Sequence, residues 1–177
     1  MKPPDLSVNI AALSLTNPVM LASGTCGYGP EIGDYCDLST LGAVIPKSVT
    51  VEPRLGNKPP RLWETPSGLL NSIGLQNEGL DEFVEKKLPM LAGLGCPIIV
   101  NIAGFTVEDF ITMAERLSPE ETVAGFEVNI SCPNVKKGGM QFGVDARAAA
   151  LVAKSVRKVT SKPVIIKLSP NVTDVTE

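Results

Sequence analysis

The chain has 177 residues, of which 44% are hydrophobic, and it can therefore fold around one hydrophobic core. Its 16 basic and 19 acidic residues give a net charge of −3 and form no basic block, which argues against nucleic acid as a partner. No apolar run is long enough to span a bilayer, and residues 1–5 lack the apolar stretch of a signal peptide. These features predict a soluble cytoplasmic protein without a membrane partner.

Two residue types restrict the chemistry. Histidine is absent, which excludes Ser-His-Asp and Cys-His catalysis as well as histidine metal sites. The 4 cysteines are widely spaced without a C-x-x-C pair, so neither a zinc site nor a redox dithiol is expected. Because a lone cysteine usually behaves as a small hydrophobic residue, we expect Cys26, Cys36 and Cys96 to be buried structural thiols.

Short apolar segments alternate along the chain with segments of helical periodicity. A hairpin is expected at residues 8–15, where it would close the floor of a barrel, followed by strands at residues 19–21, 43–48, 98–101, 126–129 and 164–167. Helices are expected at residues 80–91, at 107–117 with Thr106 as the N-cap, and at 146–159. The long connection 49–79 is expected to contain small strands at 61–64 and 68–71. This alternation predicts an α/β protein with a parallel sheet.

Either a doubly wound sheet or a TIM (β/α)8 barrel satisfies this order of elements. The glycines at 24, 27 and 29 have the wrong spacing for the dinucleotide fingerprint, which disfavours the doubly wound sheet. Polar residues lie at the C-terminal ends of the expected strands, where barrels place their active sites: Ser23, Lys47, Ser48, Asn101, Asn129 and Lys167. We therefore predict a single domain over residues 1–177, forming a barrel truncated after about five βα units.

Four segments carry candidate chemistry, and each also has an ordinary structural explanation. Residues 127–134 end a buried strand and present Cys132 between two asparagines, although a polar turn at Pro133 explains the same pattern. Lys47 could bind a phosphate, a carboxylate or a flavin, or simply extend from a strand end into solvent. Residues 71–77 form either a ligand-binding loop or a plain polar loop. Residues 164–167 resemble a kinase strand, but the chain lacks every other kinase motif.

Taken together, these segments resemble the dihydroorotate dehydrogenase family. The resemblance rests on residues 17–24, 46–50, 71–77, 129–134 and 165–170, which occur in that family's order and spacing and cover essentially the whole chain. Residues 53–61, followed by Glu64 and Thr65, resemble the class 1B branch. Cys132 also fits class 1, because the membrane-bound class 2 enzymes use serine as the base.

The resemblance implies a reaction and a set of binding residues. Cys132 would remove the C5 proton of dihydroorotate while hydride passes from C6 to FMN, so the half-reaction should accelerate as pH rises and the thiol ionises. Lys167 beside the flavin would favour its anionic reduced form. The implied FMN contacts are Ser23, Lys47, Ser48, Asn101, Asn129 and Lys167. The implied substrate contacts are Lys47, Asn71, Ser72, Ile73, Gly74, Leu75, Asn129 and Asn134.

The resemblance also implies an assembly, and other interpretations stay open beside it. Class 1B enzymes are homodimers joined to a partner subunit that carries FAD and a 2Fe-2S cluster and passes electrons to NAD, giving a heterotetramer. One alternative is another FMN-dependent pyrimidine reductase, which competition between orotate and uracil would distinguish. Another is a non-catalytic or complementing half-barrel fragment. A cysteine hydrolase at Cys132 is remote without histidine.

Overall fold

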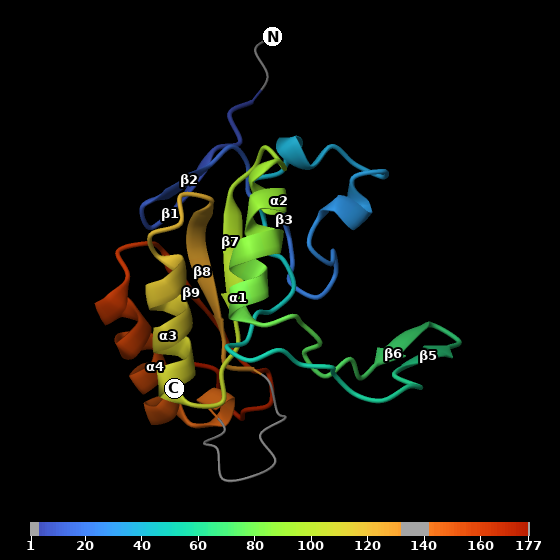
Figure 1. Ribbon diagram of the computed structural model, residues 1–177, viewed down its shortest axis with the longest axis vertical. Coiled ribbons are helices and arrows are strands. Elements are labelled where there is room, and N and C mark those ends of the chain that lie inside the picture. The colour runs from blue at the N-terminus through green and yellow to red at the C-terminus, as the bar shows by residue number, and fades with distance from the viewer. Residues whose placement is uncertain (1–3, 132–141, 177) are drawn as a thin grey trace.

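A curled parallel sheet forms the centre of the computed structural model, which describes residues 4–131 and 142–176 (Figure 1). Its strands pair in the order β3-β4-β7-β8-β9, and every adjacent pair is parallel. The strands are β3 (Met20–Leu21), β4 (Ala43–Val44), β7 (Ile98–Ile102), β8 (Val123–Asn129) and β9 (Val164–Lys167). The predicted α/β class and parallel sheet are confirmed, and the strand order is that of consecutive units of a barrel.

The helices follow the strands and pack on one face of this sheet (Figure 1). They are α1 (Leu80–Glu82), the π-helical η3 (Phe83–Lys87), α2 (Leu88–Ala92), α3 (Val107–Leu117) and α4 (Ala146–Val159), with short turns η1 (Pro30–Ile32), η2 (Leu38–Thr40) and η4 (Phe142–Val144). Thr106 caps α3 in a reciprocal capping box with Asp109, as its sequence predicts. Asp145 caps α4 by accepting hydrogen bonds from the amides of Arg147 and Ala148.

The helix expected at residues 80–91 is interrupted by a π-helical turn. The interruption covers Phe83–Lys87 and ends just before Pro89. A proline ring clashes with the carbonyl of the residue four positions earlier in a regular α-helix and leaves that carbonyl without a donor. Widening the preceding turn moves the Glu85 carbonyl away from the ring, so the helix continues to Ala92 with a bulge instead of a sharp kink.

The strand expected at residues 43–48 is much shorter than predicted. Only Ala43–Val44 pairs as β4, and the following backbone bonds to the end of β3 and then to the loop after it. The Ile45 amide donates to the Leu21 carbonyl at 3.0 Å, and the Lys47 amide donates to the Gly27 carbonyl at 2.8 Å. Pro46 has no amide hydrogen to offer a ladder, so the regular strand ends before it. The strand expected at 126–129 instead begins at Val123, and the one at 98–101 extends to Ile102.

The two faces of the sheet differ because alternate strand residues point to opposite sides. Val100 and Val128 point toward the helices and belong to the main core with Phe110 and Val156. Ile99 points to the opposite, concave face. There the N-terminal hairpin of β1 (Val8–Ile10) and β2 (Leu13–Leu15) covers it, in a smaller apolar cluster that includes Ala43, Ile45 and Ile165. The predicted hairpin is confirmed, and it packs at the N-terminal end of the concave face.

A second hairpin projects from the sheet edge within the long connection (Figure 1). It pairs β5 (Leu62–Thr65) with β6 (Gly68–Asn71), so the predicted strand at 61–64 is shifted by one residue and the one at 68–71 is confirmed. Its apolar side chains are exposed, with Trp63 at 69% and Leu70 at 64% of their full accessibility. Among the described residues, no helix has the length and apolar character needed to cross a membrane.

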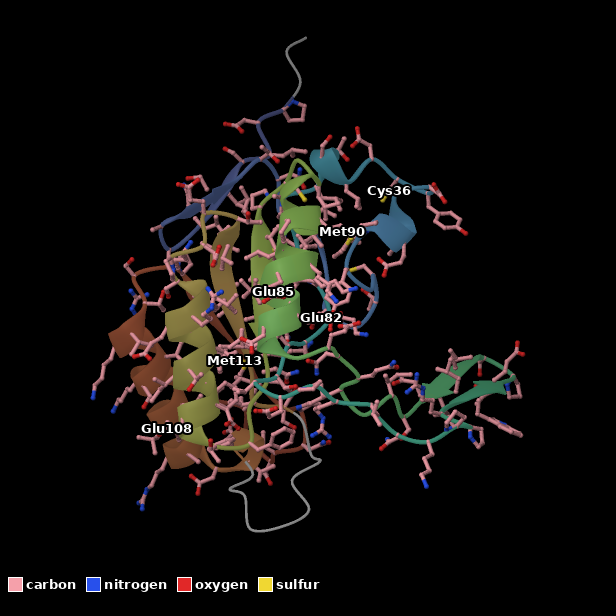
Figure 2. All side chains as sticks on the ribbon, viewed as in Figure 1. Cys36, Glu82, Glu85, Met90, Glu108 and Met113 are labelled. Atoms are coloured by element: carbon pink, nitrogen blue, oxygen red, sulfur yellow. The ribbon has the colours of Figure 1, made fainter. Side chains whose placement is uncertain are left out.

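The expectation that three cysteines are buried is wrong for Cys36. Cys26 is 2% exposed within the loop after β3, and Cys96 is half-buried, but Cys36 lies in the exposed link between η1 and η2 (Figure 2). This link consists of short turns that bury little apolar surface, so a cysteine within it stays in solvent. Burial raises the pKa of the Cys26 thiol, with the nearby Glu31 carboxylate adding to the effect.

This difference predicts selective alkylation. Iodoacetamide under native conditions should modify Cys36 at least about tenfold faster than Cys26, because Cys36 is exposed, whereas Cys26 is buried and its burial raises the pKa of its thiol. Peptide mapping by mass spectrometry measures the two rates in one sample, and unfolding in urea should make them similar. Equal rates in the native protein would contradict the packing of the loop over Cys26.

Candidate functional site

The concave face becomes polar toward the C-terminal ends of the strands. Asn101 on β7 lies beside Glu127 on β8 in the parallel register, and Lys167 ends the next strand beside Asn129. The alternation that directs Val100 and Val128 toward the helices directs these polar residues inward. Polar side chains on three adjacent strands therefore meet where barrel enzymes place their active sites.

These side chains form one connected network centred on a carboxylate oxygen. The Ser23 hydroxyl donates to Glu127 Oε1 at 2.9 Å, and the Asn101 amide donates to the same oxygen. Lys167 Nζ donates to Ser23 Oγ at 2.8 Å and lies 3.7 Å from Glu127 Oε1. Glu127 is 9% exposed, so its charge is compensated almost entirely by protein groups.

One buried acceptor in this network has no hydrogen-bond partner among the residues that the structure describes. Asn101 is fully buried, and its amide nitrogen donates to both Glu127 and Ser23, at 3.1 Å in the latter case. Its Oδ1 atom is buried without a hydrogen bond. An unpaired buried acceptor costs about 1–3 kcal/mol, so a ligand that donated an N–H here would recover a real stabilisation.

A cavity of about 480 Å³ opens beside this network. Its walls come from the loop after β3, from Lys47 and Ser48, and from the segment after the projecting hairpin. Ser48 brings the cavity close to the network, because the Asn129 amide donates to its hydroxyl at 3.4 Å and Asn129 lies beside Lys167 in the strand register. Asn129 Oδ1 in turn accepts from the Ser131 hydroxyl at 2.8 Å. The lining residues are Gly24, Gly27, Lys47, Ser48, Asn57, Asn71, Ser72, Ile73, Gly74, Leu75 and Gln76.

The segment over residues 71–77 is held in a specific backbone shape. Gly74 has φ +79°, and a Cβ there would lie 2.8 Å from the Asn57 backbone nitrogen, so only glycine fits. Leu75 has φ +56°, a conformation that costs a residue with a side chain about 1–3 kcal/mol. Asn77 anchors the end of the segment, because its buried amide bonds to the Thr50 hydroxyl at 2.9 Å and to the Leu75 carbonyl at 2.8 Å. Such strain in a cavity wall is typical of ligand-binding segments.

The ammonium of Lys47 makes a cation–π contact with an aromatic ring. It lies 5.5 Å from the centroid of Tyr28, and the ammonium of Lys87 lies 4.9 Å from the same ring. The Tyr28 hydroxyl donates to Glu78 at 2.5 Å, and burial together with this carboxylate raises the pKa of Tyr28 far above its ordinary value. Burial alone would raise the pKa of Glu78, but the bond from Tyr28 and the two lysines lower it overall.

The predicted site residues separate into two adjoining groups. The expected FMN contacts Ser23, Asn101 and Lys167 share the network, and Ser48 and Asn129 are bonded to each other beside it. The expected substrate contacts Lys47, Asn71, Ser72, Ile73, Gly74 and Leu75 line the cavity together. Cys132 and Asn134 lie outside the described residues.

Sequence reasoning gave no role to Glu127, Tyr28, Glu78 or Asn57. Glu127 had a usable signal, because an acidic residue within the buried apolar strand Val123–Asn129 needs a partner. The roles of Tyr28 and Glu78 depend on a contact between residues 50 positions apart, which local patterns do not reveal.

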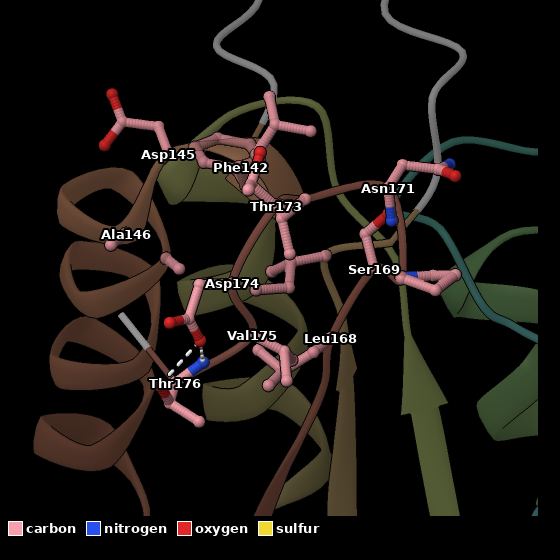
Figure 3. Close-up of a pocket in the computed structure, with 16 residues that line it drawn as sticks. Phe142, Asp145, Ala146, Leu168, Ser169, Asn171, Thr173, Asp174, Val175 and Thr176 are labelled. Atoms are coloured by element: carbon pink, nitrogen blue, oxygen red, sulfur yellow. Dashed lines mark hydrogen bonds between the residues drawn. The ribbon is translucent and has the colours of Figure 1, made fainter.

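A larger cavity of about 770 Å³ lies elsewhere, between the start of α4 and residues 168–176 (Figure 3). None of the predicted site residues lines it. The Asp145 carboxylate caps α4, and Asp174 accepts hydrogen bonds from the amide and hydroxyl of Thr176. Its acidic groups are thus engaged locally, so the smaller cavity, with its lysine and asparagines, is the better candidate site. Within the described ranges, no cluster of His, Cys, Asp or Glu could hold a metal ion.

The fold defines an α/β-barrel protein, a class in which ligand sites are found at the C-terminal ends of the parallel strands. Comparison with protein families is more specific, because the dihydroorotate dehydrogenase family model matches residues 5–177. The chain belongs to the dihydroorotate dehydrogenase family.

Similar proteins agree with this assignment. The chain is 56% identical over 177 residues to the dihydroorotate dehydrogenase B (NAD(+)) catalytic subunit of Geobacter metallireducens, and 57% identical over 175 residues to that of Geotalea daltonii. It covers 100% of its own length in the first comparison and 99% in the second, but only 58% and 57% of the two relatives. A crystal structure of DHODH from Eimeria tenella in complex with ferulenol matches 97% of this chain and 54% of that one, with a TM-score of 0.76 at 22% identity. That structure confirms the barrel fold.

The ion pair in the network predicts a measurable energetic coupling. Lys167→Met should lower the free energy of unfolding by about 1–2 kcal/mol, because it leaves the Glu127 carboxylate buried without a cation. We place the cost below that of a fully buried pair because the Lys167 side chain is 36% exposed. In a Glu127→Gln background the same substitution should cost clearly less. Urea unfolding of the four proteins in this cycle measures the difference.

The exposed pair of Glu82 and Lys86 provides the matched control. Lys86→Met should change the free energy of unfolding by less than about 0.5 kcal/mol, because both side chains are well solvated. An equal cost of Lys167→Met in both backgrounds would show that the ion pair contributes nothing to the folded state.

Proposed function

We propose that this chain binds FMN and dihydroorotate in an enzyme that oxidises dihydroorotate to orotate in pyrimidine biosynthesis. The observation that carries the proposal is the adjacency of two sites: the network on the concave face and the cavity beside it. Ser48 in the cavity wall is bonded to Asn129, which lies beside Lys167 of the network in the strand register. A two-site arrangement suits a reaction in which a bound cofactor accepts electrons from a second bound molecule. The chain spans about 58% of the curated relatives it matches, so the activity of a whole enzyme is part of the proposal.

The network suits a flavin, the cofactor that family membership implies. When bound, FMN supplies the electron acceptor for the reaction. Lys167 offers a cation with spare donors, and it is partly accessible at the end of β9. The unpaired Asn101 Oδ1 offers an acceptor for an imide N–H, a group that the flavin ring carries. These groups complement a ring edge that alternates donors and acceptors.

The cavity suits dihydroorotate. Its volume of about 480 Å³ lies in the range of small-molecule sites, roughly 300–1,000 Å³. Asn71 provides both a donor and an acceptor for the amide groups of the ring, and Lys47 provides a positive charge for the carboxylate. The Tyr28 ring stabilises the positive charge of Lys47 in the cavity wall. Lys47 therefore does not need an ion pair with a carboxylate of the described residues to be held there.

Cys132 is our proposed general base for the C5 proton. It follows Asn129 closely in sequence, immediately after the described part of the loop that leaves β8. Asn134, two residues further along the chain, is our proposed additional substrate contact. With histidine absent from the chain, a cysteine is a chemically suitable base for this position.

We further propose an assembly by analogy with the relatives, whose names identify them as catalytic subunits of an NAD(+)-linked enzyme. A partner subunit with FAD and a 2Fe-2S cluster would carry the electrons to NAD, and two copies of each subunit would form a cytoplasmic heterotetramer. In this proposal residues 1–177 act as one domain, and neither nucleic acid nor a membrane takes part.

The first test follows the bound flavin directly. The purified protein should show a visible flavin spectrum, and anaerobic dihydroorotate should bleach it. Cys132→Ala should slow the bleaching at least about 10²-fold, the usual contribution of a general base, without removing the flavin. Cys36→Ala, at an exposed thiol far from the network, should bleach at the wild-type rate. Flavin that is bleached by dihydrouracil but not by dihydroorotate would identify a different pyrimidine reductase, and protein without flavin would indicate a non-catalytic fragment.

A second test uses pH. The rate of flavin bleaching should rise with pH and level off once the Cys132 thiol is ionised, because only the thiolate accepts a proton. Stopped-flow measurements over pH 6–10 give the profile, and Cys132→Ala should lack this rise. A rate independent of pH in the wild-type protein would exclude a thiol as the base in this step.

A further inference from the structure

We infer that Glu127 is a positioning residue that sets the charge and orientation of the flavin-facing groups and thereby lowers the reduction potential of the bound flavin. The inference rests on the proposed function, because it needs the network to bind a flavin. It concerns a residue to which neither the sequence patterns nor the family resemblance assigned a role.

Glu127 is the acceptor that the other members of the network share. Its Oε1 accepts from Ser23 and from Asn101, and Lys167 Nζ lies 3.7 Å away. Ser23 follows β3, whereas the other donors come from β7 and β9 on either side of β8. The Glu127 carboxylate on β8 thus links the C-terminal ends of β3, β7 and β9 to that of β8.

This arrangement fixes the orientation of the Asn101 amide. Because its nitrogen donates to Glu127 and to Ser23, its oxygen is directed away from them, and that buried oxygen finds no partner within residues 4–131 and 142–176. An amide flipped by half a turn would place its oxygen against the carboxylate and repel it. Glu127 therefore determines that the site presents an acceptor at this position.

Glu127 also limits the positive charge that Lys167 presents. The ammonium lies 2.8 Å from the Ser23 hydroxyl and 3.7 Å from the carboxylate, so a ligand near it meets an ion pair instead of a free cation. A carboxylate near a flavin disfavours the anionic reduced form, and a lysine favours it. The two groups oppose each other, which sets the potential between the values that either charge alone would give.

The sign of the effect follows from the charges. Glu127→Gln keeps the shape and the acceptor oxygen but removes one negative charge, so the reduced flavin should be stabilised relative to the oxidised flavin. We expect the preference for the reduced form to increase about tenfold, which for a two-electron couple raises the midpoint potential by about 30 mV. Glu127→Asp keeps the charge on a shorter side chain and should give a value between those of the wild-type and Glu127→Gln proteins.

The experiment is a dye-linked redox titration of FMN bound to the wild-type, Glu127→Gln and Glu127→Asp proteins. Dissociation constants for FMN, measured by quenching of its fluorescence, are recorded for each protein alongside. Glu85→Gln is the matched control, since Glu85 is an exposed glutamate on η3 and its loss removes the same charge outside the network (Figure 2). Its midpoint potential should equal that of the wild-type protein.

The outcomes separate the inference from the proposed function. Wild-type protein that binds no FMN, or whose FMN is not reduced by dihydroorotate, would overturn the proposed function. Normal reduction in the wild-type protein with an unchanged or lower potential in Glu127→Gln would overturn the role of Glu127 alone. If Glu127→Gln does not fold, Glu127→Asp decides the question. An upward shift supports the inference, and an unchanged potential overturns it.

Discussion

The structure depends on a single requirement: a buried carboxylate on the concave face of the sheet must be compensated. Burying an isolated charge is costly enough that Glu127 has to be paired, and the groups available to pair it come from the neighbouring strand ends. The hydrogen bonds and the ion pair that compensate Glu127 bring together Ser23, Asn101 and Lys167 from elements that are distant in sequence. The same bonds that stabilise the fold thus build the floor of the site.

The rest of the site is arranged around this floor by backbone constraints. Ending β4 before Pro46 lets the chain turn against the loop after β3, which places Lys47 and Ser48 at the cavity wall. The buried Asn77 is hydrogen-bonded to Thr50 and to the Leu75 carbonyl. These bonds hold the segment 71–77 in the cavity wall, although the hairpin before it projects away from the sheet. The strained conformation of Leu75 is held by this anchoring, which is how folds maintain binding segments in unfavourable backbone shapes.

Much of this arrangement could be predicted from local patterns. Long periodic segments identified α3 and α4 with their correct ends, because N-capping residues and an apolar stripe mark both. Polar residues directly after apolar strands identified the inward-facing Asn101 and Lys167. The π-helical turn in front of Pro89 and the early end of β4 depend on how backbone groups find partners in three dimensions, and period alone does not encode this. Composition alone wrongly predicts a buried Cys36, because it does not reveal that this residue lies in an exposed link. Glu127 is different, because an acidic residue in a buried strand is a local signal for a paired charge.

A crystal structure of the protein with both FMN and orotate bound tests the two-site account most directly. The account predicts that the flavin ring contacts Asn101 and Lys167, and that orotate contacts Lys47 and Asn71 in the cavity beside it. Flavin bound in the larger cavity near α4, or orotate bound away from residues 71–75, would contradict the assignment of these two sites.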